Sequence, residues 1–260
     1  MDVYNLGVCG ETSYEIALRQ GGIKMYVGKQ VTVKPGKRTQ ISIVDESGNP
    51  VILENFNGYE TDNQQPENVV YINDIPFKLE YDNSRIYISI YDNAVNNSIK
   101  LKKGSQIITK AAHDISGDVL VIQMGSNGGW DDYDELIEQY KAMIANSGTE
   151  CYIIIGDTDN PEESVDSANY TSGQKIGTDD SMWEAALREA FGEHFINMRT
   201  YLLENALDIA GLEQTQMDEE DLLQGRVPET IKYDYTHLNS YGYYAIGYGV
   251  YEKGLELGYW

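Results

Sequence analysis

The hydrophobic periodicity of the sequence changes twice, and this change limits what the chain can fold into. From about Ile23 to Ala112, apolar and polar residues alternate in short runs separated by Pro-Gly, Ser-Gly-Asn-Pro and Asp-Asn turns. Alternation with a period of two indicates strands that bury one face. Outside this region, continuous β-branched runs such as Asp118 to Met124 alternate with helical patterns, as in a parallel sheet buried on both faces.

The two patterns divide the chain into two predicted domains. Residues 23–112 are predicted to form an all-β insertion, and residues 1–22 and 113–260 an α/β domain. In the α/β domain, alternating strands and helices predict a parallel sheet between two layers of helices. The chain is long enough for both, because 260 residues with 41% hydrophobic content can bury a fair-sized core and a smaller second one.

The α/β domain is predicted to begin with a strand, a turn and a helix. Residues 3–8 have the pattern of a short buried strand, and Gly10 provides the turn. The helix follows as far as Gln20, with Thr12 or Ser13 as its N-cap, because both residue types accept hydrogen bonds from the first turn of a helix.

The net charge is strongly negative, with 42 acidic side chains against 19 basic ones and a formal charge of −23. Such a surface repels nucleic-acid phosphates and anionic lipid headgroups, so we expect neither as a partner. The sequence has no apolar run long enough for a membrane span and no visible signal peptide, which leaves the compartment open. The oligomeric state is open as well.

The two cysteines, Cys9 and Cys151, both lie in apolar runs, outside any CxxC or Cys/His spacing. We therefore expect two buried free thiols. Nothing in the sequence calls for a metal or an organic cofactor.

Four short motifs fall where active-site loops are expected, outside the carboxyl ends of parallel strands or ahead of the last helix. They are Asn5-Leu-Gly-Val-Cys-Gly10, Gly125-Ser-Asn127-Gly-Gly-Trp130, Gly156-Asp-Thr and Asp234-Tyr-Thr-His237-Leu-Asn239. Each alone also fits an ordinary turn, loop or helix cap. Their occurrence together and in this order indicates one functional site.

The motifs resemble those of the SGNH (GDSL-type) hydrolase superfamily, whose blocks run GDS, NxGxxG, GxN and DxxH. Three of these four blocks are present, and the resemblance covers the first 20 residues and about 118–260, but not the β insertion. It implies a flavodoxin-like, three-layer α/β fold around a parallel sheet. It also implies hydrolysis of ester bonds.

By the same resemblance, the backbone N–H of Gly10 and the side-chain amide of Asn127 are oxyanion donors. His237 is the general base, and Asp234 is the carboxylate that orients it. The pocket would also include Gly125, Trp130 and Asn239, which lie in the same motifs.

The chemistry of acyl transfer suits these residue types. Neutral amide donors can stabilise the negative charge that develops on a carbonyl oxygen. A histidine can take the proton of the nucleophile, and a carboxylate can hold its tautomer through the other ring nitrogen. Of the three histidines, His113, His194 and His237, only His237 has a carboxylate at the motif spacing.

The block that carries the nucleophilic serine in this family is missing, because no Gly-Asp-Ser tripeptide occurs in the sequence. In the family this block precedes NxGxxG, so we expect the serine in a segment upstream of Met1. Thr12 and Ser13 are weaker candidates that we interpret as helix caps. Loss of the neighbouring strand predicts that residues 3–8 either pair with residues 119–124 or leave an open apolar slot that another chain or segment fills.

The sequence therefore predicts a serine-type ester hydrolase. Acyl or acetyl esters of carbohydrates are the expected substrates, by analogy with family members that carry inserted β domains. The alternative is a non-catalytic binding or scaffold protein, with the β insertion as a site for a ligand such as a glycan.

Overall fold

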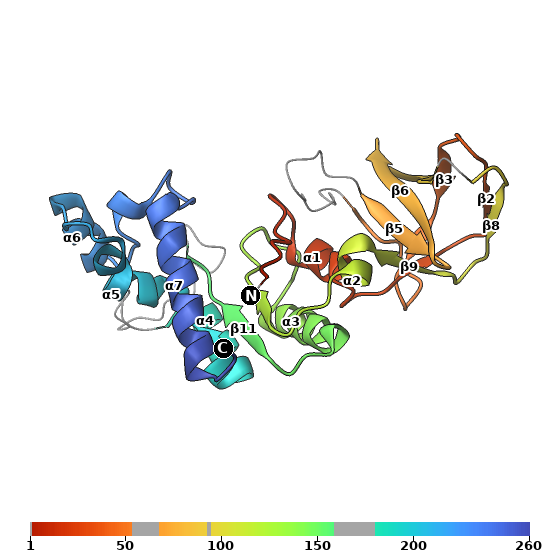
Figure 1. The fold of residues 1–260 in the computed structure, drawn as a ribbon. Helices are drawn as coiled ribbons and strands as arrows, with labels where there is room; N and C mark the ends of the chain where they lie inside the picture. The colour runs from red at the N-terminus through yellow and green to blue at the C-terminus, as the bar shows by residue number, and fades with distance from the viewer. Residues whose placement is uncertain (1, 54–67, 93–94, 159–179) are drawn as a thin grey trace. The chain divides into compact units, whose positions relative to one another are not determined.

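The computed structural model describes residues 2–53, 68–92, 95–158 and 180–260 (Figure 1). The chain divides into two units. The first contains residues 1–117 and 138–148, and the second contains residues 118–137 and 149–260. Helix α3 (Tyr133–Ser147) supplies residues to both.

Antiparallel strands make up most of the first unit. Seven of them form one sheet in the order β3-β7-β6-β5-β9-β1-β4, and β2 pairs with β8 in a separate two-stranded ribbon. Their bounds are β1 (Met25–Val27), β2 (Val31–Val33), β3 (Thr39–Ile41), β4 (Ile43–Val44), β5 (Val69–Ile72), β6 (Ile75–Asp82), β7 (Arg85–Ile90), β8 (Ile99–Leu101) and β9 (Gln106–Thr109).

The alternating pattern explains how this unit builds its core. Phe77 and Leu79 on β6 and Ile88 on β7 are buried, while residues between them point away from the core. The hairpins β5–β6 and β6–β7 close through two-residue turns, Asn73-Asp74 and Asn83-Ser84, in which both residues have positive φ. Such turns match the twist of the paired strands, which fixes the register of the three.

Two short helices complete the first unit, α1 (Ser13–Arg19) and α2 (Lys110–Asp114). Of the two predicted N-caps, Thr12 and Ser13, it is Thr12 that caps the first helix. Its Oγ1 accepts the N–H of Glu15 at 3.3 Å, and the Glu15 carboxylate accepts the N–H of Thr12 at 3.1 Å. The end of α1 is tied back to its start by a buried ion pair, in which Arg19 donates to Glu11 from Nε and NH2 at 2.8 and 2.6 Å.

A small parallel sheet forms the centre of the second unit. Its strands β10 (Leu120–Ile122), β11 (Tyr152–Ile155) and β12 (Phe195–Ile196) lie side by side in chain order. The helices are α4 (Met182–Phe191), α5 (Met198–Ala210), α6 (Gln216–Leu223) and α7 (Ser240–Glu256), with short 3-10 turns η2 (Gly192–His194) and η3 (Glu229–Ile231).

Helix α7 lies along α5 (Figure 1). The contact is close because α7 presents glycine to it: a Cβ built on Gly249 would lie 2.7 Å from the ring of Tyr201. Met198, Leu202 and Ala245 are fully buried between these helices and the sheet. This packing holds the first residue of α7, and the loop before it, against the body of the unit.

The predicted fold class is wrong. The flavodoxin-like, three-layer arrangement requires a large parallel sheet, whereas the parallel sheet of the described residues has three strands and the larger sheet is antiparallel with seven. The local elements after residue 118 were predicted correctly as alternating strands and helices. The parallel sheet that these strands form is smaller than the flavodoxin-like fold requires. Most of the strands belong to the region that was predicted to be an insertion.

Residues 2–8 also differ from the prediction, because they form no strand and most of them are exposed, with Val3 at 80%. A local hydrogen bond from the N–H of Gly7 to Oδ1 of Asn5, at 3.0 Å, replaces strand pairing. The expected pairing of these residues with β10 is therefore not formed, and β10 lies at the edge of the sheet that the described residues form. Neither cysteine is buried: Cys9 is exposed and Cys151 is half-buried.

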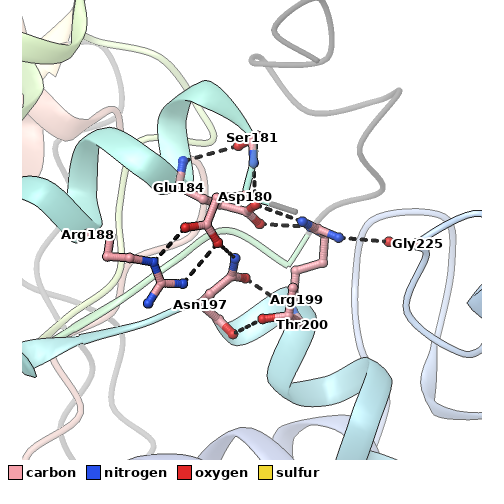
Figure 2. Close-up of polar contacts among 8 residues, drawn as sticks. All are labelled: Asp180, Ser181, Glu184, Arg188, Asn197, Arg199, Thr200 and Gly225. Atoms are coloured by element: carbon pink, nitrogen blue, oxygen red, sulfur yellow. Dashed lines mark hydrogen bonds and ion pairs between the residues drawn. The ribbon is translucent and has the colours of Figure 1, made fainter. Parts of the chain in front are cut away.

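A network of charged and polar groups joins the helices of the second unit (Figure 2). Arg199, at the start of α5, donates to both carboxylate oxygens of Glu184 on α4 at 2.8 and 2.7 Å. Its NH1 also donates to the carbonyl of Gly225 at 3.3 Å. Beside this pair, Asp180 accepts hydrogen bonds from Arg188 and from the amide of Asn197, the N-cap of α5.

Candidate active site

The DxxH motif lies on a tight loop between η3 and α7. Nδ1 of His237 is 2.9 Å from Oδ2 and 3.0 Å from Oδ1 of Asp234. The loop closes on itself, because the N–H of Tyr233 donates to the carbonyl of His237 at 2.8 Å, and Lys232 pairs with Leu238 in an antiparallel bridge. The backbone therefore fixes the two side chains in contact.

The carboxylate of Asp234 is held in its ionised form. Its Oδ1 accepts the backbone N–H of His237 at 2.7 Å and that of Thr236 at 3.0 Å. The backbone hydrogen bond of His237, followed by the contact with its ring and the N–H of Thr236, lowers the pKa of Asp234 to about 2. A carboxylate only accepts hydrogen bonds, so in the neutral imidazole of His237 the contact places the ring proton on Nδ1 and leaves Nε2 as an acceptor.

The imidazole is accessible as well as oriented. The side chain of His237 is 61% exposed and that of Asp234 39%. On either side of the aspartate, Tyr233 and Tyr235 are 80% and 74% exposed. Two exposed aromatic side chains therefore flank Asp234 in the sequence.

Asn239 secures the loop to the last helix. As the N-cap of α7, its Oδ1 accepts the N–H of Tyr241 at 2.9 Å and of Gly242 at 3.3 Å, while its Nδ2 donates to the carbonyls of Thr230 and Lys232. The side chain thus holds both ends of the loop that carries Asp234 and His237. The geometry gives Asn239 a positioning role.

The second motif follows β10 as a compact glycine loop. Gly125 has a φ of +117°, and its carbonyl accepts the N–H of Gly128 at 2.8 Å and the indole N–H of Trp130 at 3.0 Å. A Cβ on Gly125 would lie 2.6 Å from the ring of Trp183, so this position admits only glycine without a shift of the indole. The side chain of Asn127 is on the exposed side of this loop.

Sequence reasoning missed a contact between this loop and the next one. The hydroxyl of Ser126 donates to Oδ1 of Asp157 at 2.9 Å, and this oxygen also accepts the N–H of Thr158. The contact joins the carboxyl ends of β10 and β11, which are adjacent in the sheet. The sequence signal for this contact was the position of Asp157, two residues after the last residue of the parallel strand β11.

Gly10, Thr12 and Ser13 belong to the first unit, whereas Asn127, Asp234 and His237 belong to the second. Gly10 has a φ of +78° at the turn before α1, and nothing lies within 4 Å of the place of a Cβ. Thr12 is engaged in capping, as described above. Ser13 is fully buried, and its Oγ has no hydrogen-bond partner among the described residues.

The other two histidines have different surroundings. His113 is 2.6 Å from Asp114, a contact that sequence reasoning did not foresee, and its ring stacks on Tyr71 with centroids 3.8 Å apart. The same carboxylate binds Lys110 at 2.6 Å, so its charge is shared. Nδ1 of His194 contacts the hydroxyl of Tyr259 at 2.9 Å. Among the residues that the structure describes, neither ring therefore has a carboxylate that binds it alone.

No family model, curated protein or solved structure matches this chain. Among the helices that the structure describes, none combines the length and apolarity needed to cross a bilayer. In the described ranges, no three His, Cys, Asp or Glu side chains gather as ligands for a metal ion.

Proposed function

We propose that this protein is an ester hydrolase of the type that the SGNH motifs suggest, with His237 as general base and Asp234 as the residue that orients it. The observation that carries the proposal is the contact of Nδ1 of His237 with both oxygens of an ionised Asp234. The proposal depends on this site and not on the fold class, since one fold can support many chemistries.

The geometry suits the transfer of a proton during acyl transfer. With its proton held on Nδ1, the ring can accept the proton of a nucleophile at Nε2 and then donate it to the leaving alcohol. The carboxylate also stabilises the imidazolium that forms between these two steps. In the proposal, the side-chain amide of Asn127, which belongs to the same unit as His237, stabilises the oxyanion.

The proposal also needs a nucleophilic hydroxyl, which the Asp234–His237 pair does not itself supply. Thr12 and Ser13 suit this role poorly, because Thr12 caps α1 through its hydroxyl and Ser13 is fully buried. A nucleophile needs an accessible oxygen within reach of its base.

For the substrate, we propose acyl or acetyl esters of carbohydrates. The exposed rings of Tyr233 and Tyr235 on either side of Asp234 support this class, because a tyrosine can stack on a sugar ring through its face and bond a hydroxyl through its phenol. The ester bond would then lie near Nε2 of His237. No cofactor enters the proposed reaction.

A second candidate is a non-catalytic binding protein. It is favoured by one specific observation: the sequence lacks a Gly-Asp-Ser tripeptide, while Thr12 and Ser13 are held at the start of a helix. The retained Asp234–His237 contact favours the hydrolase.

The test is hydrolysis of 4-nitrophenyl acetate by the chain, by the variant His237→Ala and by His194→Ala as a matched control. Removal of the base is expected to lower turnover by about 10²–10⁴-fold, whereas the control should keep the wild-type rate. A wild-type chain that shows no turnover favours the binding protein, and equal rates in both variants contradict the role of His237. A fluorophosphonate probe with peptide mapping then identifies any nucleophile.

A further inference from the structure

Six lysines of the first unit gather in two segments that carry no acidic residue. The segments are residues 29–37 and 98–104, and the lysines are Lys29, Lys34, Lys37, Lys100, Lys102 and Lys103. The whole chain has 42 acidic side chains and a net charge of −23. Positive charge is therefore concentrated here against the trend of the sequence.

Strand pairing brings the two segments together. β2 and β8 form an antiparallel ribbon in which Thr32 lies opposite Lys100. Val33 and Leu101 are fully buried beneath the ribbon, whereas Thr32 and Lys100 are exposed on its outer face. The alternation of side chains places Lys34 and Lys102 on that same face.

The remaining lysines extend this line at the two turns that end the ribbon. Lys34 and Lys37 flank a Pro-Gly turn, closed by the N–H of Lys37 on the carbonyl of Lys34 at 3.1 Å, and Lys103 lies in the turn that follows Lys102. Strand β8 carries Lys100, and Lys102 and Lys103 follow its last residue directly. We call these six residues the lysine ribbon; all six are exposed.

Within the described residues, the lysine ribbon has no counterion of its own. In the part of the chain that the structure describes, none of its six ammonium groups forms an ion pair, although the neighbouring Arg38 binds Asp82 at 2.8 Å and stacks on Tyr87. Lysines elsewhere, such as Lys24, Lys141 and Lys253, pair with glutamates. Like charges on adjacent positions of a ribbon repel, so this cluster weakens folding unless an anion neutralises it.

We infer that the lysine ribbon binds an acidic polysaccharide, a linear chain of uronic-acid sugars. Its charges follow a line, which suits a polymer with a carboxylate on each unit. The absence of arginine from the ribbon disfavours nucleic acid, whose phosphates are bound best by the bidentate guanidinium, and the net charge of −23 repels a polyanion as dense as DNA. The choice of a carbohydrate rests on the proposed function, but binding itself does not require turnover.

The test is titration calorimetry of the full chain with polygalacturonate at low and at physiological salt, with dextran as the neutral polymer. The variant Lys34→Gln/Lys100→Gln/Lys102→Gln is expected to bind at least roughly tenfold more weakly, with a smaller dependence on salt. The matched control, Lys24→Gln/Lys141→Gln/Lys253→Gln, loses the same charge from paired lysines and should stay within about twofold of wild type. Thermal unfolding of both variants verifies that the fold is kept.

Four results would overturn the inference: no binding of polygalacturonate at low salt, equal binding by the two triple variants, equal or tighter binding of a DNA duplex, or equal binding of dextran.

A second copy of this acidic chain is the competing occupant of the lysine ribbon. Sedimentation at low salt tests it, since a dimer lost only in the ribbon variant would replace the polysaccharide. Hydrolysis of 4-nitrophenyl acetate does not involve the ribbon, so failure of this inference and failure of the proposed hydrolase are separate results.

Discussion

Arg199 donates from Nε and NH2 to the two carboxylate oxygens of Glu184, and both side chains are almost fully buried. The pair joins the start of α5 to the first turn of α4 (Figure 2). Removal of one partner leaves the other charge buried without compensation. The geometry of the second unit therefore depends on keeping both.

The first prediction concerns this ion pair. Arg199→Met should lower the free energy of unfolding by about 3–5 kcal/mol, because Glu184 loses its counterion. Arg188→Met removes an equal charge from a half-exposed pair with Asp180 and should cost about 1 kcal/mol or less. Urea unfolding of the two variants measures the difference, and equal losses would contradict the prediction.

The second prediction separates two glycines of one loop. Gly125→Ala combines a positive φ with a Cβ 2.6 Å from Trp183, so it should destabilise the protein by on the order of 3 kcal/mol. Gly128 has a φ of +73° but open space around it, so Gly128→Ala should cost only about 1 kcal/mol. Thermal unfolding checks the order, and the fluorescence of Trp183 should change in the first variant alone.

The third prediction concerns the hydroxyls at the start of α1. Thr12→Ala should cost about 1 kcal/mol, because it removes the N-cap. Ser13→Ala should be neutral or stabilising, since the buried hydroxyl of Ser13 makes no hydrogen bond to any described residue. Chemical denaturation gives both values. If either variant abolished ester hydrolysis while the fold was kept, that residue would be the nucleophile.

Elements and local contacts were predictable from the sequence. The N-cap Thr12 is three residues from its partner Glu15, and Asp234 is three residues from His237. Short spacings of this kind follow from helix and loop geometry. Contacts between distant residues were not predictable: Ser126 and Asp157 are 31 positions apart, and Glu184 and Arg199 are 15 apart.

The fold class was wrong for a related reason. Periodicity indicates that a segment is a strand, but it does not specify the strand's partners or the number of strands in the sheet. Residues 3–8 have an apolar pattern like that of a buried strand. The N–H of Gly7 instead donates to Oδ1 of Asn5, and these residues form no strand. The motif residues lie in loops whose local conformation does not depend on the size of the sheet, which is why the Asp234–His237 contact could be predicted although the fold class could not.

The last prediction concerns the acid stability of the DxxH loop. Hydrogen bonds from His237 and Thr236 lower the pKa of Asp234 from its ordinary 3.8 to about 2 in the folded protein. Because the pKa is lower in the folded protein, this carboxylate stabilises the fold at pH values above its ordinary pKa. That contribution is lost as the pH falls from about 4 to about 2. Carboxyl NMR should show Asp234 titrating near the lower value. The stability difference between wild type and Asp234→Asn should shrink over the same range. A normal titration of Asp234 would mean that the carboxylate does not hold His237 in solution, and the proposed base would then lose the group that orients it.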